Sequence, residues 1–401
     1  MKNLYYRNIE GTSPGYWGLL GALALLIAAG LGSSYYMEHH GHIVTGMSNQ
    51  VVWGLPHVFA IFLIVAASGA LNVASIGTVF DKVPYKPVGR FSALLAMALL
   101  IGGLIVLVLD LGRPDRLIVA MTKYNFKSIF AWNIFLYTGF LAIVGFYLWA
   151  MMDRMVGKYY KPAGVFAFVW RLILTTGTGS IFGFLVARDA YDAAILAPLF
   201  IIMSFAFGLA IFLLLIMGIY SATGRELSET VLKRWKNLLG VFVAAVLLLV
   251  VIYHLYKLYI TRTHGIEGFI LLNGGVYTSL FWIGQILIGT LLPLFIVFSK
   301  LGKSRFWLVI ACLAVILGGF AQLYVIIIGG QVYPLPLFPG MEVSSTFSDG
   351  VVAHYTPSLP EFLLGMSGVA ITLLAVLFVV KILDILPDSL GDSVVNPHAA
   401  S

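Results

Sequence analysis

Long apolar stretches recur along the whole of this chain. A helix that crosses the hydrocarbon core of a bilayer needs roughly 20 mostly apolar residues. The strands of a membrane β-barrel would instead alternate over about ten residues, which these stretches do not. We therefore predict an all-α, polytopic integral membrane protein with about ten transmembrane helices. The stretches fall at about 16–36, 52–78, 91–110, 128–151, 164–187, 193–221, 237–260, 273–299, 306–329 and 361–383.

Composition excludes several other classes of protein. Only 10% of the 401 residues are charged, against about 25% in an average soluble domain, so a soluble enzyme or a disordered chain is excluded. The single cysteine, Cys312, excludes a disulfide scaffold and a CxxC metal site. An iron–sulfur cluster needs several thiolates, so this chain alone cannot hold one. We expect no metal or haem on this chain, and a packing role for Cys312.

The distribution of Lys and Arg predicts the orientation in the membrane. The two termini and the loops on their side hold 16 of the 24 basic residues, and the loops on the other side hold 7. Because cytoplasmic loops carry the excess of Lys and Arg, both termini are predicted to be cytoplasmic, in a multi-pass protein of the cell inner membrane. The net charge of +7 reflects this bias and gives no reason to invoke nucleic acid. Arg171, inside the fifth span, is expected to snorkel to the cytoplasmic edge.

The polar side chains point to the outer face as the working face. Seven of the eight histidines lie at or beyond that side, with His57 one turn into the second span and His254 near the end of the seventh. By contrast, none of the seventeen acidic residues is predicted at mid-membrane. Proton pumps and ion-coupled carriers normally use such carboxylates, so their absence weighs against both.

A charged turn after the third span supplies the candidate site. The turn has the sequence Asp-Leu-Gly-Arg-Pro-Asp-Arg at 110–116. In one reading Asp110 pairs with Arg113 and locks the turn. In the other, the two side chains flank the polar headgroup of a ligand, and the carboxylate exchanges protons with it. A quinone site needs flat apolar contacts, donors for two carbonyls and proton-exchanging groups. We predict proton exchange at His57 and Asp110. The quinone contacts are predicted to come from His57, Asp110, Arg113, Tyr124, Ser128, Trp132 and Asn133.

Several motifs resemble one known family. They are Trp-Gly-Leu-Pro-His at 53–57, Ser-Gly-Ala at 68–70, the turn at 110–116, Asn-Phe-Lys-Ser at 125–128 and Gly-Ser at 179–180. Together these motifs resemble the polysulfide reductase membrane subunit (PsrC), or NrfD-like, family over about residues 50–330.

The resemblance implies a single membrane domain whose core, residues 51–330, forms two four-helix bundles. Residues 1–50 would add an N-terminal helix and outer loop. Residues 331–401 would add an outer loop, a last helix and a cytoplasmic tail. The resemblance also implies a quinone site near the outer face, lined by His57, Asp110, Arg113 and the start of the fourth span, beneath an extracytoplasmic iron–sulfur partner. Several ten-helix relatives carry a histidine where this chain has Leu174, so no histidine role is implied there.

Within the family, the first 21 residues and Thr-Gly-Thr-Gly-Ser-Ile-Phe-Gly at 176–183 most resemble membrane subunits of sulfite-reductase-associated electron-transport complexes. The chain would then be a quinone-reactive subunit without its own metal centre, and menaquinone or ubiquinone would be its exchangeable substrate. The implied partners are a ferredoxin-like iron–sulfur subunit, a triheme cytochrome c, a haem b membrane subunit and a heterodisulfide-reductase-like cytoplasmic subunit.

Three alternatives stay open at this point. The chain could serve another oxidoreductase, of the polysulfide reductase or hydrogenase type. It could bind haem b through His57 and His254, since such a haem usually needs axial histidines. It could also be a transporter with a helix broken at Gly177 and Gly179.

Overall fold

The computed structural model describes residues 4–335, 338 and 350–395. Part of the predicted outer loop after residue 330, including Pro336 and Pro339, therefore lies outside the described residues, as does the end of the predicted tail. The described part is helical, with two isolated β-bridges. Its helical elements are α1 (Pro14–His40), η1 (His42–Val44), α2 (Leu55–Thr78), η2 (Val83–Val88), α3 (Gly89–Leu109), η3 (Pro114–Arg116), α4 (Leu117–Thr122), α5 (Ile129–Met152), η4 (Gly157–Tyr159), α6 (Tyr160–Gly183), α7 (Leu196–Thr223), α8 (Glu229–Tyr259), η5 (Thr261–Thr263), α9 (His264–Gly268), η6 (Phe269–Asn273), α10 (Val276–Ser279), η7 (Leu280–Leu291), α11 (Leu292–Phe298), η8 (Lys300–Lys303), α12 (Arg305–Tyr324), η9 (Val325–Gly329), α13 (Gly330–Val332), α14 (Leu359–Ile382) and α15 (Asp392–Val395).

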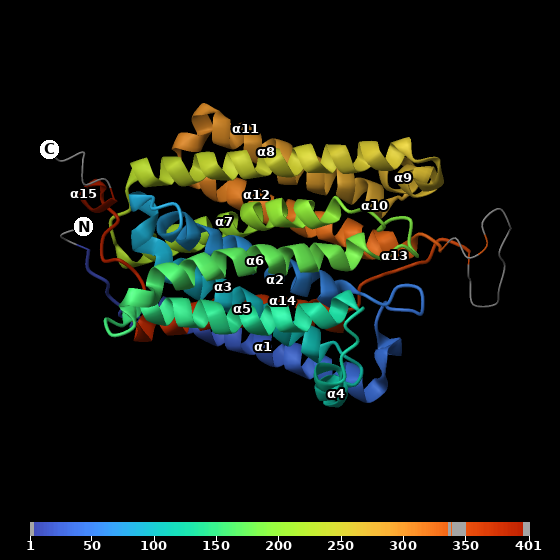
Figure 1. Ribbon diagram of the computed structural model, residues 1–401, viewed down its shortest axis with the longest axis horizontal. Helices are drawn as coiled ribbons and strands as arrows, with labels where there is room; N and C mark the ends of the chain where they lie inside the picture. Colours follow the sequence, from blue (N-terminus) through green and yellow to red (C-terminus); the bar gives the residue numbers. More distant parts are fainter. Residues whose placement is uncertain (1–3, 336–337, 339–349, 396–401) are drawn as a thin grey trace.

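Ten helices of the described chain are long and apolar enough to cross a membrane, which confirms the all-α, multi-pass prediction. They run along the long axis of the molecule, and the first and last described residues of the chain lie at the same end (Figure 1). We call the opposite end the far end. It carries the start of α2 and α14 and the end of α3 and α8, so residues distant in sequence meet there.

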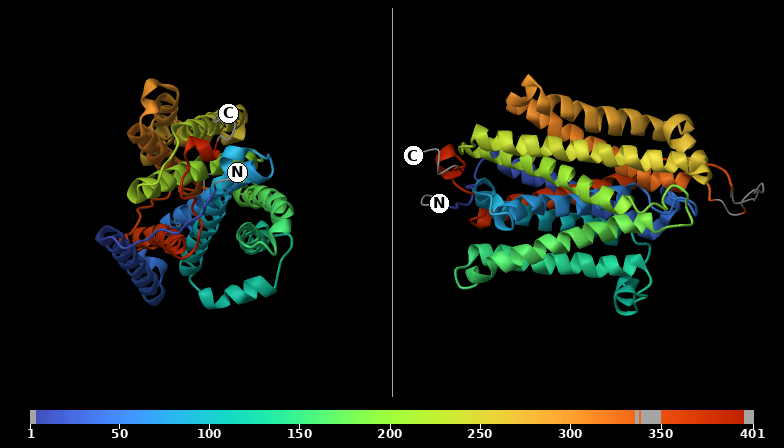
Figure 2. Two further views of the ribbon diagram at one scale, coloured as in Figure 1. Left: turned by 90° about the vertical axis from the view of Figure 1, so that its left-hand side faces the viewer. Right: turned by 45° about the horizontal axis from the view of Figure 1, so that its top comes forward.

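The helices form two groups of four with one extra pair. Helices α2, α3, α5 and α6 pack together as a first bundle, and α7, α8, the η7–α11 helix and α12 as a second. Helix α1 packs along α14, which in turn lies against α3 and α2. The end-on view in Figure 2 shows the yellow and orange helices of the second bundle grouped apart from α5 and α6.

The two bundles join where α2 and α7 approach most closely. A Cβ atom on Gly208 of α7 would lie 2.1 Å from the backbone nitrogen of Ala70 and 2.2 Å from the carbonyl carbon of Gly69. Small residues allow membrane helices to approach in this way, because lipid offers no hydrophobic driving force between helices. Backbone-to-backbone packing therefore fixes how one bundle sits on the other.

Arg171 is buried instead of snorkelling, so that prediction is wrong. Its side chain is 1% exposed. One guanidinium nitrogen donates to Asn72 Oδ1 at 2.8 Å, and the group lies over the rings of Phe168 and Phe205. Helix α2 offers polar partners within hydrogen-bonding reach, so the guanidinium turns inward. Cys312 is buried and free, in agreement with its predicted packing role.

Candidate functional site

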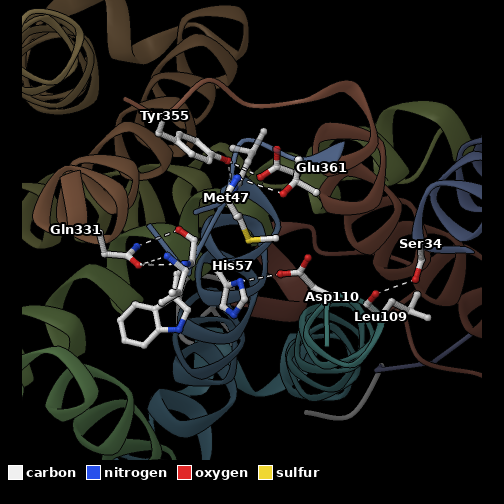
Figure 3. Close-up of polar contacts among 12 residues, drawn as sticks. Ser34, Met47, His57, Leu109, Asp110, Gln331, Tyr355 and Glu361 are labelled. Carbon is white, nitrogen blue, oxygen red and sulfur yellow. Dashed lines mark hydrogen bonds and ion pairs between the residues drawn. The ribbon is translucent and has the colours of Figure 1, made fainter. Parts of the chain in front are cut away.

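The candidate site is built on a histidine–carboxylate pair at the far end of the first bundle. Pro56 lies in the first turn of α2, where its missing N–H costs no hydrogen bond, and His57 follows it. Asp110 follows the last residue of the antiparallel helix α3, so the two side chains meet. His57 Nδ1 and Asp110 Oδ2 lie 2.8 Å apart, and the side chains are 22% and 1% exposed (Figure 3). The carboxylate is thus buried behind the partly accessible imidazole.

The pair keeps hydrogen-bonding capacity for a ligand. His57 Nδ1 and Asp110 Oδ2 are in ion-pair contact, but among the described residues neither oxygen of Asp110 accepts a hydrogen bond in good geometry. No hydrogen bond of the described residues uses His57 Nε2 either. A buried polar atom without a partner is costly, so a ligand hydroxyl or carbonyl would satisfy groups that the protein leaves open.

An aromatic wall stands next to this pair. The Trp53 ring lies 6.4 Å from the His57 ring between centroids, and it also packs against Phe130 of α5 at 5.9 Å and Phe182 of α6 at 5.7 Å. Aromatic faces of this kind are suited to contact a flat apolar ring. The segment before α2 and the helices α5 and α6 therefore all contribute to the surface beside the imidazole.

Gln331 holds the backbone of Trp53 in place. Its Oε1 atom accepts hydrogen bonds from the N–H groups of Val52 and Trp53 at 2.9 and 3.0 Å, and its Nε2 group donates to the Trp53 carbonyl at 3.0 Å. Gln331 lies in α13, and Figure 3 shows it beside the start of α2. The second bundle thereby fixes the segment that precedes His57.

Glu361 and Tyr355 secure the first residue of α2. The Leu55 N–H donates to the Tyr355 hydroxyl at 2.7 Å, and this hydroxyl donates to Glu361 Oε1 at 2.7 Å. Glu361 Oε2 accepts from the N–H groups of Gly46 and Ser358 at 2.9 and 2.8 Å. Burial and, next, the Glu361 carboxylate raise the pKa of Tyr355, so its hydroxyl stays protonated and keeps donating.

We expect Glu361→Gln to lower stability by about 1–3 kcal/mol, the usual cost of leaving a buried donor unpaired. Glu361 accepts three hydrogen bonds with its two oxygens, whereas the amide nitrogen of glutamine cannot accept, so at least one buried donor would lose its acceptor. The thermal midpoint of the purified chain measures the change. Glu10→Gln, at a side chain that is exposed, is the control, and an equal midpoint for both variants would contradict the role of Glu361.

The structure separates Arg113 from Asp110. Arg113 Nε lies 3.2 Å from Asp115 Oδ1, and both side chains are exposed. This hydrogen bond lowers the pKa of Asp115. The suggested Asp110–Arg113 pair does not form, because the turn at 111–112 carries Arg113 into solvent while Asp110 stays under α2.

The other predicted quinone contacts lie at the entry to α5. Tyr124 packs on Phe135 with centroids 4.3 Å apart, and the Trp132 indole N–H donates to the Phe126 carbonyl at 2.9 Å. Ser128 caps α5 without a side-chain hydrogen bond. Asn133 is buried, and its Nδ2 group donates to the Ile129 and Gly177 carbonyls. The polar and ring contacts of these four residues do not include His57 or Asp110, so their quinone role stays a prediction.

Sequence reasoning missed Gln331, Tyr355, Glu361 and Phe130 as parts of this site. Only Glu361 had a readable local signal, because Ser358 and Glu361 form a capping box whose Ser-x-x-Glu spacing is recognisable. Gln331 lies 278 positions from Trp53 in the chain. No local pattern reports a contact over such a separation.

The second membrane-embedded histidine belongs to a different bundle. His254 of α8 lies against Glu267 of α9, with Nδ1 and Oε2 2.7 Å apart. His57 and His254 thus each face a carboxylate in a different bundle and do not form a facing pair for one haem. Among the described residues, no group of three or more His, Cys, Asp or Glu side chains could hold a metal ion.

Comparison with known proteins agrees with this architecture. An "Hdr-like menaquinol oxidoreductase integral membrane subunit" of Archaeoglobus fulgidus is 30% identical over 98% of this chain and 99% of its own. A selenate reductase subunit of Mesobacillus selenatarsenatis is 24% identical over 88% and 91%. A "putative dimethyl sulfoxide reductase membrane subunit" of Halobacterium salinarum is 27% identical over 57% of each chain. Residues 43–335 match the polysulphide reductase NrfD family, and the chain therefore belongs to that family of membrane proteins.

Proposed function

We propose that this chain is a quinone-interacting membrane anchor that passes electrons between a membrane quinone beside His57 and an iron–sulfur partner docked on the far end. The observation that carries the proposal is the His57–Asp110 pair, a partly accessible imidazole on a buried carboxylate. Proton-active groups of this kind are what quinone chemistry needs, since a quinone gains or loses two electrons and two protons.

In the proposed site, His57 exchanges the proton. The contact of Nδ1 with Asp110 leaves Nε2 to face a quinone oxygen, as acceptor for a quinol hydroxyl or as donor to a quinone carbonyl. Asp110 orients the ring and stabilises the imidazolium that forms when His57 holds the extra proton. Asp110 Oδ1, the oxygen that does not contact His57, can accept a further hydrogen bond from a ligand or water.

The aromatic wall would provide the apolar part of the site. Phe130 of α5 and Phe182 of α6 both pack on Trp53, which lies in the segment before α2, so the wall is preorganised. Gln331 and Glu361 hold the backbone around Trp53 and His57 and act as positioning residues. Arg113, Tyr124, Ser128, Trp132 and Asn133 remain proposed quinone contacts.

The distribution of basic residues supports placing the far end on the outer face of the inner membrane, with both termini in the cytoplasm. A ferredoxin-like iron–sulfur subunit would then dock outside. The menaquinol in the name of the Archaeoglobus relative favours menaquinone over ubiquinone.

The assembly proposed for this chain is sulfite-reductase-associated. The opening residues and the stretch at 176–183 resemble DsrP, the membrane protein of the DsrMKJOP complex, and the Hdr-like relative supports a heterodisulfide-reductase-like partner in the cytoplasm. The proposed set also includes a triheme cytochrome c and a haem b membrane subunit. The names of the selenate reductase and dimethyl sulfoxide reductase relatives favour, as the second candidate, a subunit of another oxidoreductase.

The proposal is tested by purifying a tagged copy from gently solubilised native membranes and identifying the polypeptides that accompany it. An iron–sulfur subunit together with a multihaem cytochrome c, in a preparation that oxidises a menaquinol analogue, is the expected result. A molybdenum or hydrogenase catalytic subunit would keep the quinone role and replace the assembly. A chain that purifies alone would contradict the electron-transfer proposal.

A further inference from the structure

A second buried histidine–carboxylate pair lies in the second bundle, outside the proposed quinone site. Glu267 is assigned to an outer loop by sequence, yet the structure places it in the short helix α9, folded back against α8. Its side chain is 2% exposed and that of His254 is 15% exposed. The Phe281 ring packs on the imidazole edge, with centroids 4.7 Å apart. The pair is thus enclosed by apolar and aromatic groups.

One small cavity borders this pair, and a second shares two of its wall residues farther along the bundle. The first has a volume of about 40 Å³ and is lined by His254, Glu267, Gln285 and Gln322 together with apolar side chains. The second, of about 10 Å³, shares Gln285 and Gln322 and adds Thr290. A cavity needs roughly 10–15 Å³ and several polar partners to hold a water molecule. The first cavity meets both conditions, and the second is at the limit.

One wall group of these cavities has no partner. The Gln322 Nε2 group is buried and makes no hydrogen bond within the described part of the chain. A buried amide donor without a partner costs about 1–3 kcal/mol. Water in the cavity would remove this cost, so the amide is a second, independent sign that the site is hydrated.

The helices that line the cavities contain π-helical turns. Three π-helical segments, η6, η7 and η9, each contribute lining residues, among them Ile270, Gln285 and Val325. π-helical turns are rare and occur frequently at functional sites. In η7 the wider turn surrounds Gln285, the side chain that both cavities share.

The charged side chains around the pair already have hydrogen-bond or ion-pair partners. Lys257 donates to the backbone carbonyls of Asp189, Tyr191 and Asp192, and Arg262 pairs with the carboxylates of Asp189 and Asp192. The Tyr253 hydroxyl donates to the Ala190 carbonyl. From η7 and α12, the polar groups that line the cavity are the amides of Gln285 and Gln322. His254 and Glu267 are therefore the two groups placed to exchange a proton with cavity water.

We propose that His254 and Glu267 form a second proton-exchange site, distinct from the quinone site. The pair takes up one proton from water at the far end and returns it there, and no electron moves. Water in the two cavities connects the pair with Gln285 and Gln322 deeper in the bundle. The site would thus be a hydrated inlet that brings a protonatable carboxylate inside the second bundle without involving His57 or Asp110.

Infrared difference spectroscopy of the full-length chain in lipid nanodiscs tests this proposal. The sample is acidified in steps from roughly pH 9 to pH 4, which covers the ordinary pKa values of His and Glu side chains. We expect one carboxylic acid band that shifts when H₂O is replaced by D₂O and that is missing in Glu267→Gln. The matched control is Glu361→Gln, at a buried carboxylate held by three hydrogen bonds, which should keep the band.

Two further variants keep the test decisive if Glu267→Gln does not fold. His254→Gln removes the partner of the carboxylate and should move the band. Gln322→Leu removes a polar wall of both cavities and should slow the D₂O shift of the band at least about tenfold. A band that persists in Glu267→Gln, does not shift in D₂O, or is absent from the wild-type chain would overturn the proposal. Quinone turnover is not measured, so failure here leaves the quinone site unaffected.

Discussion

Replacing His57 with alanine should lower quinone-coupled electron transfer at least about 100-fold, at the lower end of what a positioned acid–base group contributes. The variant loses the proton-exchanging imidazole, while Asp110 stays behind as a buried carboxylate. Turnover is measured in the purified complex with a menaquinol analogue, and the set of co-purifying polypeptides is determined in parallel. We expect the accompanying polypeptides to be retained, because they would dock on the far end and not on the imidazole.

Two companion variants separate chemistry from packing. His39→Ala removes an exposed histidine that stacks on Tyr35 and should leave turnover unchanged. Asp110→Asn keeps the shape of the side chain and removes its charge, so turnover should fall at least about tenfold while the thermal midpoint changes little. Wild-type turnover in His57→Ala would contradict the assignment of the quinone site to this pair.

Replacing Gly208 with alanine should weaken the docking of the two bundles by about 3 kcal/mol, at the upper end of the usual cost of overpacking. The added Cβ would lie 2.1 Å from the Ala70 nitrogen and 2.6 Å from the Ala66 carbonyl oxygen. These are backbone atoms of a buried helix, so they cannot move aside as a flexible side chain would. The expected result for the detergent-solubilised chain is a large fall in the thermal midpoint of a melting curve, or loss of the monodisperse peak in gel filtration.

The matched control lies on the same helix. Gly218 is also in α7, and a Cβ atom there would meet nothing within 4 Å. Gly218→Ala should therefore be neutral or slightly stabilising, since alanine favours the helix by about 1 kcal/mol over glycine. Equal stability of the two variants would show that the close contact of α2 with α7 does not hold the bundles together.

Local composition was enough to determine the class of this fold. Each membrane helix satisfies its own backbone hydrogen bonds and needs a continuous apolar stretch, so ten spans could be located by sequence alone. The buried position of Cys312 followed in the same way. The family resemblance rested on short motifs such as that at 110–116, which are also local.

The partners of the polar side chains could not be determined locally. Asp110 pairs with His57 and not with Arg113, which is three positions away, because antiparallel helices bring the start of α2 to the end of α3. Arg171 turns inward because Asn72 of a neighbouring helix offers an acceptor. In each case the nearest partner is set by helix packing.

Hydropathy and short motifs therefore sufficed to predict the helical membrane class, the number of spans and the family. Helix packing set which polar groups meet: His57 with Asp110, Gln331 with the backbone of Trp53, and His254 with Glu267. A buried polar group must find its partner within about 3 Å, and only the packing of distant segments determines which group is there.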